Sequence, residues 1–229
     1  MRKCLLGVSV FLACYAAQAV TFFEIATAGT QKKREEIIAS QFVQDMSKGV
    51  LSQARFSYFK TEDKKYVWRY SDNLMVLAAK AGDYRVRSFL QQAAVDSTKE
   101  WNGPRPTDMS QCPSCLAYSN FEAASVAHSF AVGIAALLPC YTVYWEVGNW
   151  LKGHSVPHNP YQFWIDAYSE PGSHKHVEDM VSFANEIYEI STSEVRESML
   201  RAYIFSTIYE LQFFDSAYNL IQWETTHAQ

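Results

Sequence analysis

Apolar residues recur along most of the chain at the three- and four-residue spacing of an α-helix. Gly and Pro, 9 and 7 residues, cluster between these periodic stretches. The pattern predicts an all-α protein. Ser191 and Glu194 have the spacing of a capping box, which supports the start of the last helix. The helices we expect are residues 23–47, 52–80, 84–101, a path of 118–138 and 140–152 kinked at Pro139, and then 161–170, 174–190 and 193–223.

The connections between these helices are short, and the sequence shows no internal repeat or linker. We therefore expect one domain over residues 20–229, folded as an antiparallel helical bundle. Residues 1–19 are different, because Arg2 and Lys3 precede a short apolar stretch that ends in Ala17-Gln18-Ala19. This arrangement is typical of a cleaved signal peptide, and the stretch is too short to span a bilayer.

The signal-like segment predicts an exported protein, periplasmic or secreted, with no membrane attachment after cleavage. An apolar first helix of a cytoplasmic protein is the alternative. A lipoprotein anchor at Cys14 fits the surrounding residues poorly.

Charge and motif content exclude several classes of function. The net charge is -4 and no long basic block occurs, which argues against nucleic-acid binding. Glu224 and His227 have the spacing of a diiron ligand pair but are alone, so we expect no metal. Gly-rich phosphate loops and nucleophile elbows are missing, and we expect no cofactor. Aromatic residues make up 15% of the chain, enough to line a cavity.

Two acidic residues lie on apolar helical stripes. Asp63 shares a face with four aromatic residues of residues 52–80, and Glu210 lies on the apolar stripe of the last helix. A buried carboxylate must be hydrogen-bonded, paired or directed at a polar cavity, so the two acids are candidates for acid/base chemistry or substrate recognition. Alternatively, each pairs with a buried Arg or Lys, or the stripe is rotated by one residue. Glu62 and Lys64 are expected on the solvated side.

Cys140 directly follows Pro139 and shares a helical face with Tyr144, a favourable place for a nucleophile. A lone Cys in an apolar run is also typical of a small core residue. A dyad of Cys140 with His128 or His158 stays open.

The Cys112–Cys115 pair has three possible interpretations: a redox pair, half of a zinc site or a local disulfide. We interpret it as a structural loop feature, which leaves Cys140 as the odd free thiol.

Five segments, in this order and spacing, resemble the thiaminase II (TenA) family: residues 56–66, 117–120, 138–148, 159–168 and 205–215. The resemblance extends from about residue 35 to 219. It implies a haem-oxygenase-like bundle without haem or metal, usually a homotetramer. It further implies a hydrolase that releases 4-amino-5-hydroxymethyl-2-methylpyrimidine from thiamin or from the 5-aminomethyl pyrimidine. A non-catalytic binder of the same ligands and a metal-dependent enzyme are the alternatives.

Roles carry over from the family position by position. Cys140 matches the nucleophile, Glu210 the acid/base and Asp63 the carboxylate that binds the aminopyrimidine edge. The chemistry then requires a raised pKa at Glu210 and an increased thiolate share at Cys140. Glu62 departs from the family, which usually has Gln before this Asp. The residues that match the aromatic and phenolic wall are Tyr66, Tyr118, Tyr144, Tyr168 and Phe213.

Overall fold

The computed structural model describes residues 20–99 and 103–224, and these residues form helices and loops without a strand. This confirms the all-α prediction. The proposed signal peptide, residues 1–19, and His227 lie outside the described residues. The helices are α1 (Phe22–Ala39), α2 (Gln41–Ser47), α3 (Gln53–Lys80), α4 (Tyr84–Lys99), α5 (Pro113–His128), α6 (Phe130–His154), α7 (Gln162–Ser169), α8 (Pro171–Ile190) and α9 (Ser193–Asn219).

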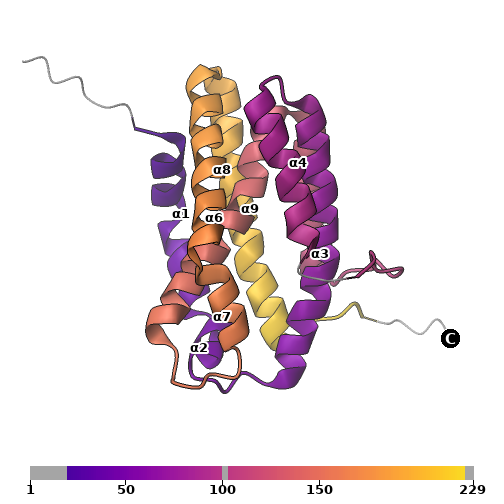
Figure 1. The fold of residues 1–229 in the computed structure, drawn as a ribbon, viewed down its shortest axis with the longest axis vertical. Coiled ribbons are helices and arrows are strands. Elements are labelled where there is room, and N and C mark those ends of the chain that lie inside the picture. Colours follow the sequence, from indigo (N-terminus) through magenta and orange to yellow (C-terminus); the bar gives the residue numbers. More distant parts are fainter. Residues whose placement is uncertain (1–19, 100–102, 225–229) are drawn as a thin grey trace, which may run out of the picture.

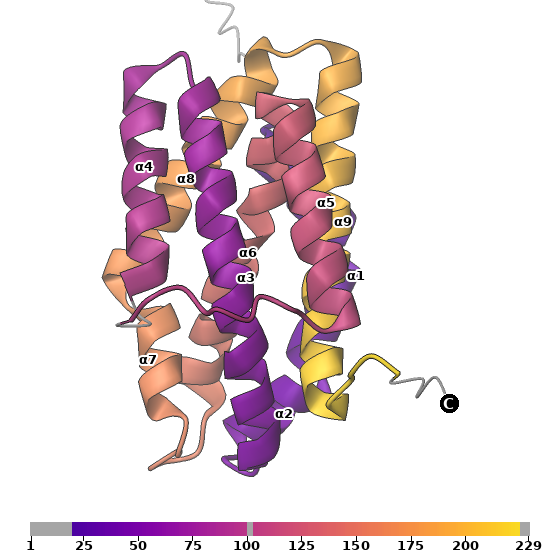
Figure 2. The ribbon, with the colours of Figure 1, turned by 90° about the vertical axis from the view of Figure 1, so that its right-hand side faces the viewer.

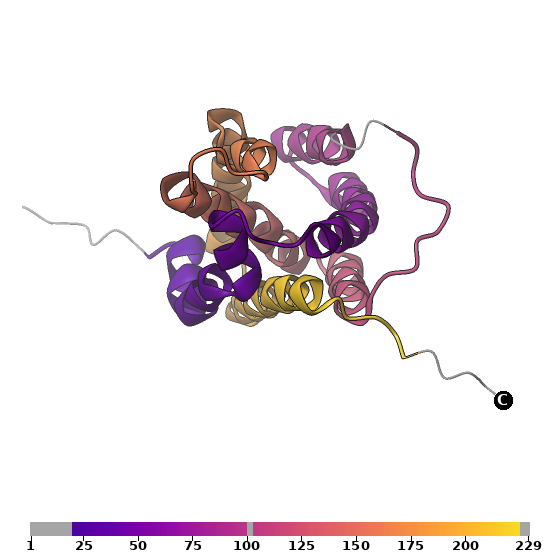
Figure 3. The same cartoon turned by 90° about the horizontal axis from the view of Figure 1, so that it is seen from below.

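The helices form an elongated bundle in which α6 is the most enclosed element (Figure 1). It packs against α5, α7, α8 and α9, while α3 lies along α4. A view along the bundle shows α3 and α4 on the opposite side from α1 (Figure 3). Within the described ranges, α6 has the length and apolar composition to cross a membrane, but 67% of its apolar window is buried, as expected of a core helix.

Two expected helices are each divided by one serine. Ser40 separates α1 from α2, and Ser129 separates α5 from α6. In both places the hydroxyl accepts a hydrogen bond from a main-chain N–H of the next helix, Val43 and Val132 respectively. Such a cap ends one helix and starts another without interrupting the apolar period, so periodicity alone missed both breaks.

The predicted capping box at the last helix is wrong. Thr192 caps α9 by accepting from the Val195 N–H, whereas the Ser191 hydroxyl donates to Ile187 O at the end of α8. Ser191 and Thr192 both carry a hydroxyl group that can cap a helix, and the sequence does not show which of them does so. Only the direction of the chain at the start of the helix decides which one is the N-cap.

Pro139 lies inside a continuous α6. Proline has no N–H for the helical ladder, so the carbonyls around it need other donors. The Ser206 hydroxyl donates to Ala136 O at 2.7 Å, and the Tyr70 hydroxyl donates to Leu137 O at 2.9 Å. These bonds join α9 and α3 to the turn of α6 that carries Cys140.

The segment before α5 crosses the outside of α3 (Figure 2). It covers Glu62, which is 5% exposed, so its expected position on the solvated side is wrong. The Glu62 Oε2 atom accepts the Cys112 N–H at 2.6 Å, and its Oε1 atom is 2.9 Å from Lys65 Nζ. Periodicity within one helix carries no information about a distant loop that covers it.

The interpretation of Cys112–Cys115 as a loop feature is also wrong. The pair opens α5, with Cys112 as the N-cap and Pro113 as the first helical residue. Both thiols are free, as is that of Cys140.

Candidate active site

A cavity of about 230 Å³ opens among α3, α4, α6, α7 and α8, and Cys140 forms part of its wall. Five of the twelve lining residues are aromatic, and Asp96 and His176 add polar groups. The volume suits a small heterocycle more than an extended ligand. The aromatic side chains of the wall are Tyr70, Tyr141, Tyr144, Trp145 and Tyr168.

Cys140 is half-buried on α6 and is held as a neutral thiol. Burial raises its pKa well above the ordinary value, and the negative charges of Glu210 and Glu122 raise it further. A hydrogen bond with Tyr66 lowers the pKa but does not offset these effects. The expected increase of the thiolate share is therefore wrong for the protein without a ligand, because burial and, after it, two nearby carboxyl groups disfavour the thiolate.

Glu210 is 1% exposed on α9, and the Tyr118 hydroxyl donates a hydrogen bond to its Oε1 atom at 2.9 Å. Burial raises the pKa of Glu210 to about 8, the Tyr118 hydrogen bond lowers it, and the charge of Asp63 raises it. The expected raised pKa is confirmed. At neutral pH Glu210 is therefore largely protonated and can act as an acid.

Glu122, on α5, is a buried carboxyl group that the sequence analysis missed. It is fully buried, and its Oε1 atom accepts a hydrogen bond from the Tyr66 hydroxyl at 2.7 Å. Its Oε2 atom makes no hydrogen bond within the described part of the chain. Burial raises the pKa of Glu122 well above the ordinary value. Its position four residues after Tyr118, on the same helical face, is the sequence signal that points to it.

Two phenol–carboxyl pairs thus lie side by side behind the cavity wall. The rings of Tyr66 and Tyr118 stack with centroids 5.1 Å apart, and each hydroxyl donates to a different carboxyl group. The charges of Glu122 and Glu210 also raise the pKa of the Tyr66 hydroxyl, after burial and the charge of Cys140. The pKa values of Cys140 and Tyr66 therefore both depend on the charges of the two glutamates, and we call Cys140, Tyr66 and the two glutamates the electrostatic unit.

Asp63 is 2% exposed on α3, and its Oδ2 atom is 3.9 Å from Lys60 Nζ. Asp63 thus has a basic residue at the distance limit of an ion pair, as the alternative expected. Glu210 instead accepts a hydrogen bond from the phenol of Tyr118. The charge of Asp63 raises the pKa values of both Glu210 and Cys140, so it belongs to the same unit.

The predicted aromatic wall is only partly at the surface of the cavity. Tyr144 and Tyr168 line it, with ring centroids 5.3 Å apart. The Tyr144 hydroxyl is buried and has no hydrogen-bond partner among the described residues. The other predicted aromatic residues, Tyr66, Tyr118 and Phe213, are buried and are not among the residues that line the cavity, and the same holds for Asp63 and Glu210.

A histidine dyad has no support in the structure. His128 and His158 are exposed, and neither lines the cavity around Cys140. Over residues 20–99 and 103–224, no group of three or more His, Cys, Asp or Glu side chains is arranged to hold a metal ion.

Comparison with known proteins agrees with the geometry. Residues 104–220 match the family model described as the TENA/THI-4/PQQC family. An aminopyrimidine aminohydrolase of Bacillus subtilis is 30% identical over 80% of this chain and 83% of its own length. The thiamine biosynthesis multifunctional protein ThiED of Corynebacterium efficiens is 28% identical, over 80% of this chain and 26% of that longer protein.

Solved structures show the same fold. A TenA homologue from P. horikoshii OT3 superposes with a TM-score of 0.77 at 20% identity, covering 87% of this chain and 99% of the other. A second TenA homologue, from Pyrococcus furiosus, gives a TM-score of 0.78 at 18% identity, over 86% and 99% of the two chains. The predicted haem-oxygenase-like helical fold is therefore confirmed. With this fold and the match of the B. subtilis relative across most of both sequences, the chain belongs to the TENA/THI-4/PQQC family.

Proposed function

We propose that the protein is a hydrolase that acts on aminopyrimidines of the thiamin type, with Cys140 as its nucleophile. The B. subtilis relative is named an aminopyrimidine aminohydrolase and the C. efficiens relative a thiamine biosynthesis protein, which supports this substrate class. One observation carries the proposal: a thiol in the cavity wall has a pKa that depends on buried carboxyl groups from three other helices. These groups are Glu210, Glu122 and Asp63.

In the reaction we propose, the Cys140 sulfur forms a bond to a carbon of the electron-poor pyrimidine ring, and Glu210 donates its proton to a ring nitrogen. The bond between the exocyclic methylene and its nitrogen substituent then breaks, and the departing amine or thiazole keeps the electron pair. Water adds to the methylene through its oxygen and releases one proton to solvent. The C–S bond breaks, and the ring proton returns to Glu210. Each turnover consumes one water and releases 4-amino-5-hydroxymethyl-2-methylpyrimidine.

Recognition of the ring would use the groups around the thiol. Asp63 accepts hydrogen bonds from the amino edge of the pyrimidine, and Tyr144 and Tyr168 contact the ring face. The buried Tyr144 hydroxyl supplies a further donor or acceptor to a ligand.

The positive charge of the substrate would activate the nucleophile. A thiazolium or a primary ammonium group beside Cys140 lowers the pKa of its thiol, opposing the effect of the carboxyl groups. Tyr66 is hydrogen-bonded to Glu122 and interacts with Cys140, which supports a route for the thiol proton toward Glu122. The thiolate would then form only when a cationic substrate is bound.

The test is the Cys140→Ser variant, assayed by chromatography for release of the hydroxymethyl pyrimidine from thiamin and from the 5-aminomethyl pyrimidine. We expect loss of release from both, with an unchanged helical circular dichroism spectrum. Cys112→Ser, which alters a thiol outside the cavity, is the matched control and should retain release. Unchanged turnover in Cys140→Ser contradicts the nucleophile. Calorimetric binding to the wild-type protein without product selects the alternative, a non-catalytic binder.

Two further predictions from the sequence remain to be measured. Light scattering of the purified protein tests the homotetramer, and N-terminal sequencing of the native protein tests export. A mature chain that begins after Ala19 is the expected result.

A further inference from the structure

The segment Cys112-Pro113-Ser114-Cys115 opens α5, and none of its side chains lines the cavity. Cys112 is the N-cap residue and Cys115 is the third residue of the helix. The Cys112 side chain makes no capping hydrogen bond, and its thiol instead interacts with the thiol of Cys115. The helix start thus brings two thiols together, and the proposed hydrolysis uses neither of them.

The pKa of the Cys112 thiol is lowered, whereas that of the Cys115 thiol is raised. The interaction with the Cys115 thiol is the largest effect on Cys112 and, with the nearby Ser114 and Tyr58 hydroxyl groups, lowers the pKa of Cys112 to about 6 despite burial. Burial raises the pKa of Cys115 well above its ordinary value, and the charges of Cys112 and Glu62 contribute. At neutral pH, Cys112 is therefore a thiolate and Cys115 is a thiol.

We propose that Cys112 and Cys115 are a redox-active dithiol that reacts with low-molecular-weight disulfides of the glutathione type. The Cys112 thiolate attacks one sulfur of the small disulfide, forms a mixed disulfide and releases the first small thiolate, which takes a proton from solvent. Cys115 then passes its proton to solvent and attacks Cys112 Sγ. The Cys112–Cys115 bond forms, and the second small thiolate leaves and is protonated. The protein loses two electrons and the small disulfide gains them.

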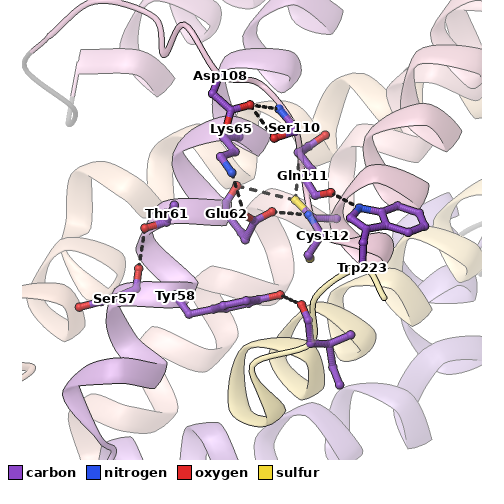
Figure 4. A network of polar contacts seen from close by, with 12 residues as sticks. Ser57, Tyr58, Thr61, Glu62, Lys65, Asp108, Ser110, Gln111, Cys112 and Trp223 are labelled. Atoms are coloured by element: carbon purple, nitrogen blue, oxygen red, sulfur yellow. Dashed lines mark hydrogen bonds and ion pairs between the residues drawn. The ribbon is translucent and has the colours of Figure 1, made fainter. Parts of the chain in front are cut away.

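The surroundings favour redox exchange over metal binding. Both oxygens of Glu62 are already used, by the Cys112 N–H and by Lys65 (Figure 4). Gln111 Nε2 donates a hydrogen bond to Cys115 Sγ at 2.9 Å. With Glu62 occupied, the pair has no nearby ligand to complete a zinc site, and no such cluster is found among the residues described.

The chain after α9 closes over the dithiol. The Trp223 indole N–H donates to Gln111 O at 2.8 Å, and the Tyr58 hydroxyl donates to Ile221 O (Figure 4). Cys112, next to Gln111, is only 2% exposed, and we call residues 220–224, which bond to Gln111 and Tyr58, the covering segment. A small disulfide therefore reaches Cys112 only when the covering segment moves away. Trp223 is 56% exposed, so few contacts hold it in place.

In the test, the full-length protein is incubated in glutathione buffers of increasing oxidised fraction. Acid then stops the exchange, and the remaining thiols are alkylated in denaturant at neutral pH. Peptide mass spectrometry reads each cysteine separately. We expect a Cys112–Cys115 disulfide while Cys140 stays alkylatable. In the native reduced protein, the alkylation rate of Cys112 should rise with pH with a midpoint near 6. Because formation of the Cys112–Cys115 disulfide involves neither Cys140 nor a pyrimidine, failure here leaves the proposed hydrolase untouched.

Three variants sharpen the test. Cys115→Ser should accumulate glutathione on Cys112, because the resolving thiol is gone, whereas Cys112→Ser should leave Cys115 unmodified. Trp223→Ala should form the disulfide several-fold faster than the wild-type protein. A dithiol that stays reduced in fully oxidised buffer, in both wild type and Trp223→Ala, overturns the proposal. Glutathione found on Cys115 in Cys112→Ser overturns the order of attack.

Discussion

The raised pKa of Glu210 predicts a specific dependence of stability on pH. The carboxyl pKa is 4.5 in its ordinary environment and about 8 in the folded protein. Between these values the folded state holds a proton that the unfolded state has released. The stabilisation is therefore complete below pH 4.5 and is lost as the pH rises through 8. The perturbation that isolates it is Glu210→Gln, which keeps an oxygen acceptor for the Tyr118 hydroxyl but does not titrate.

The size of the effect follows from the two pKa values. At about 1.4 kcal/mol for each tenfold change in proton affinity, the complete shift corresponds to about 5 kcal/mol. Most of it, about 3.5 kcal/mol, falls between pH 5 and pH 8. Over this range the free energy of unfolding of the wild-type protein should decrease by that amount relative to Glu210→Gln. Glu122 and Asp63 are present in both proteins, so the difference reports mainly Glu210.

The assay is urea unfolding followed by circular dichroism, at one protein concentration, at half-unit steps from pH 5 to 8. Glu197→Gln changes an exposed glutamate on the same helix and should differ from wild type by the same amount at every pH. A difference between wild type and Glu210→Gln that stays flat refutes the reasoning. Glu210 would then be ionised in the folded protein at neutral pH and could not serve as the acid.

Two other substitutions probe the same site. Glu122→Gln removes a charge that raises the pKa of Cys140, so the alkylation rate of Cys140 at pH 9 should increase, about tenfold for each unit by which its pKa falls. The alkylation rate of Cys112 should not change. An unchanged rate at Cys140 contradicts the electrostatic coupling of Glu122 and Cys140. Gly148→Ala would place a Cβ 2.7 Å from Tyr168 O, so it should lower the free energy of unfolding by about 1–3 kcal/mol in thermal or urea unfolding and raise KM for the pyrimidine. Gly153→Ala, which has open space around it, is the control and should be neutral or stabilising. Equal effects of the two substitutions would contradict the close contact between α6 and α7.

The helices were predictable because burying a helix face imposes a three- to four-residue apolar period. Residues 52–80 were expected as one helix and form α3 from Gln53 to Lys80. The breaks at Ser40 and Ser129 were not predictable from that period, because a single capping hydroxyl redirects the chain without altering the pattern of apolar residues.

The candidate site was predictable where a charge interrupted an apolar stripe. Asp63 and Glu210 were singled out in this way, and both are buried. Glu122 follows Tyr118 by four residues but went unnoticed, because Ser119 and Ser125, which are buried on the same helix, are small polar residues and do not form an apolar stripe. Glu62 was misplaced because the loop that buries it belongs to a distant part of the sequence.

The sequence by itself determined the helical class of the protein and the family resemblance, and it supplied the candidate reactive groups, because periodicity and residue chemistry are local properties. Only the tertiary structure decided their state. Packing of four other helices around α6 buries Cys140 beside two carboxyl groups and raises its pKa, whereas the start of α5 gives Cys112 hydrogen-bond donors that lower its pKa. A pKa depends on every charge and dipole near the group, and the fold alone sets those neighbours.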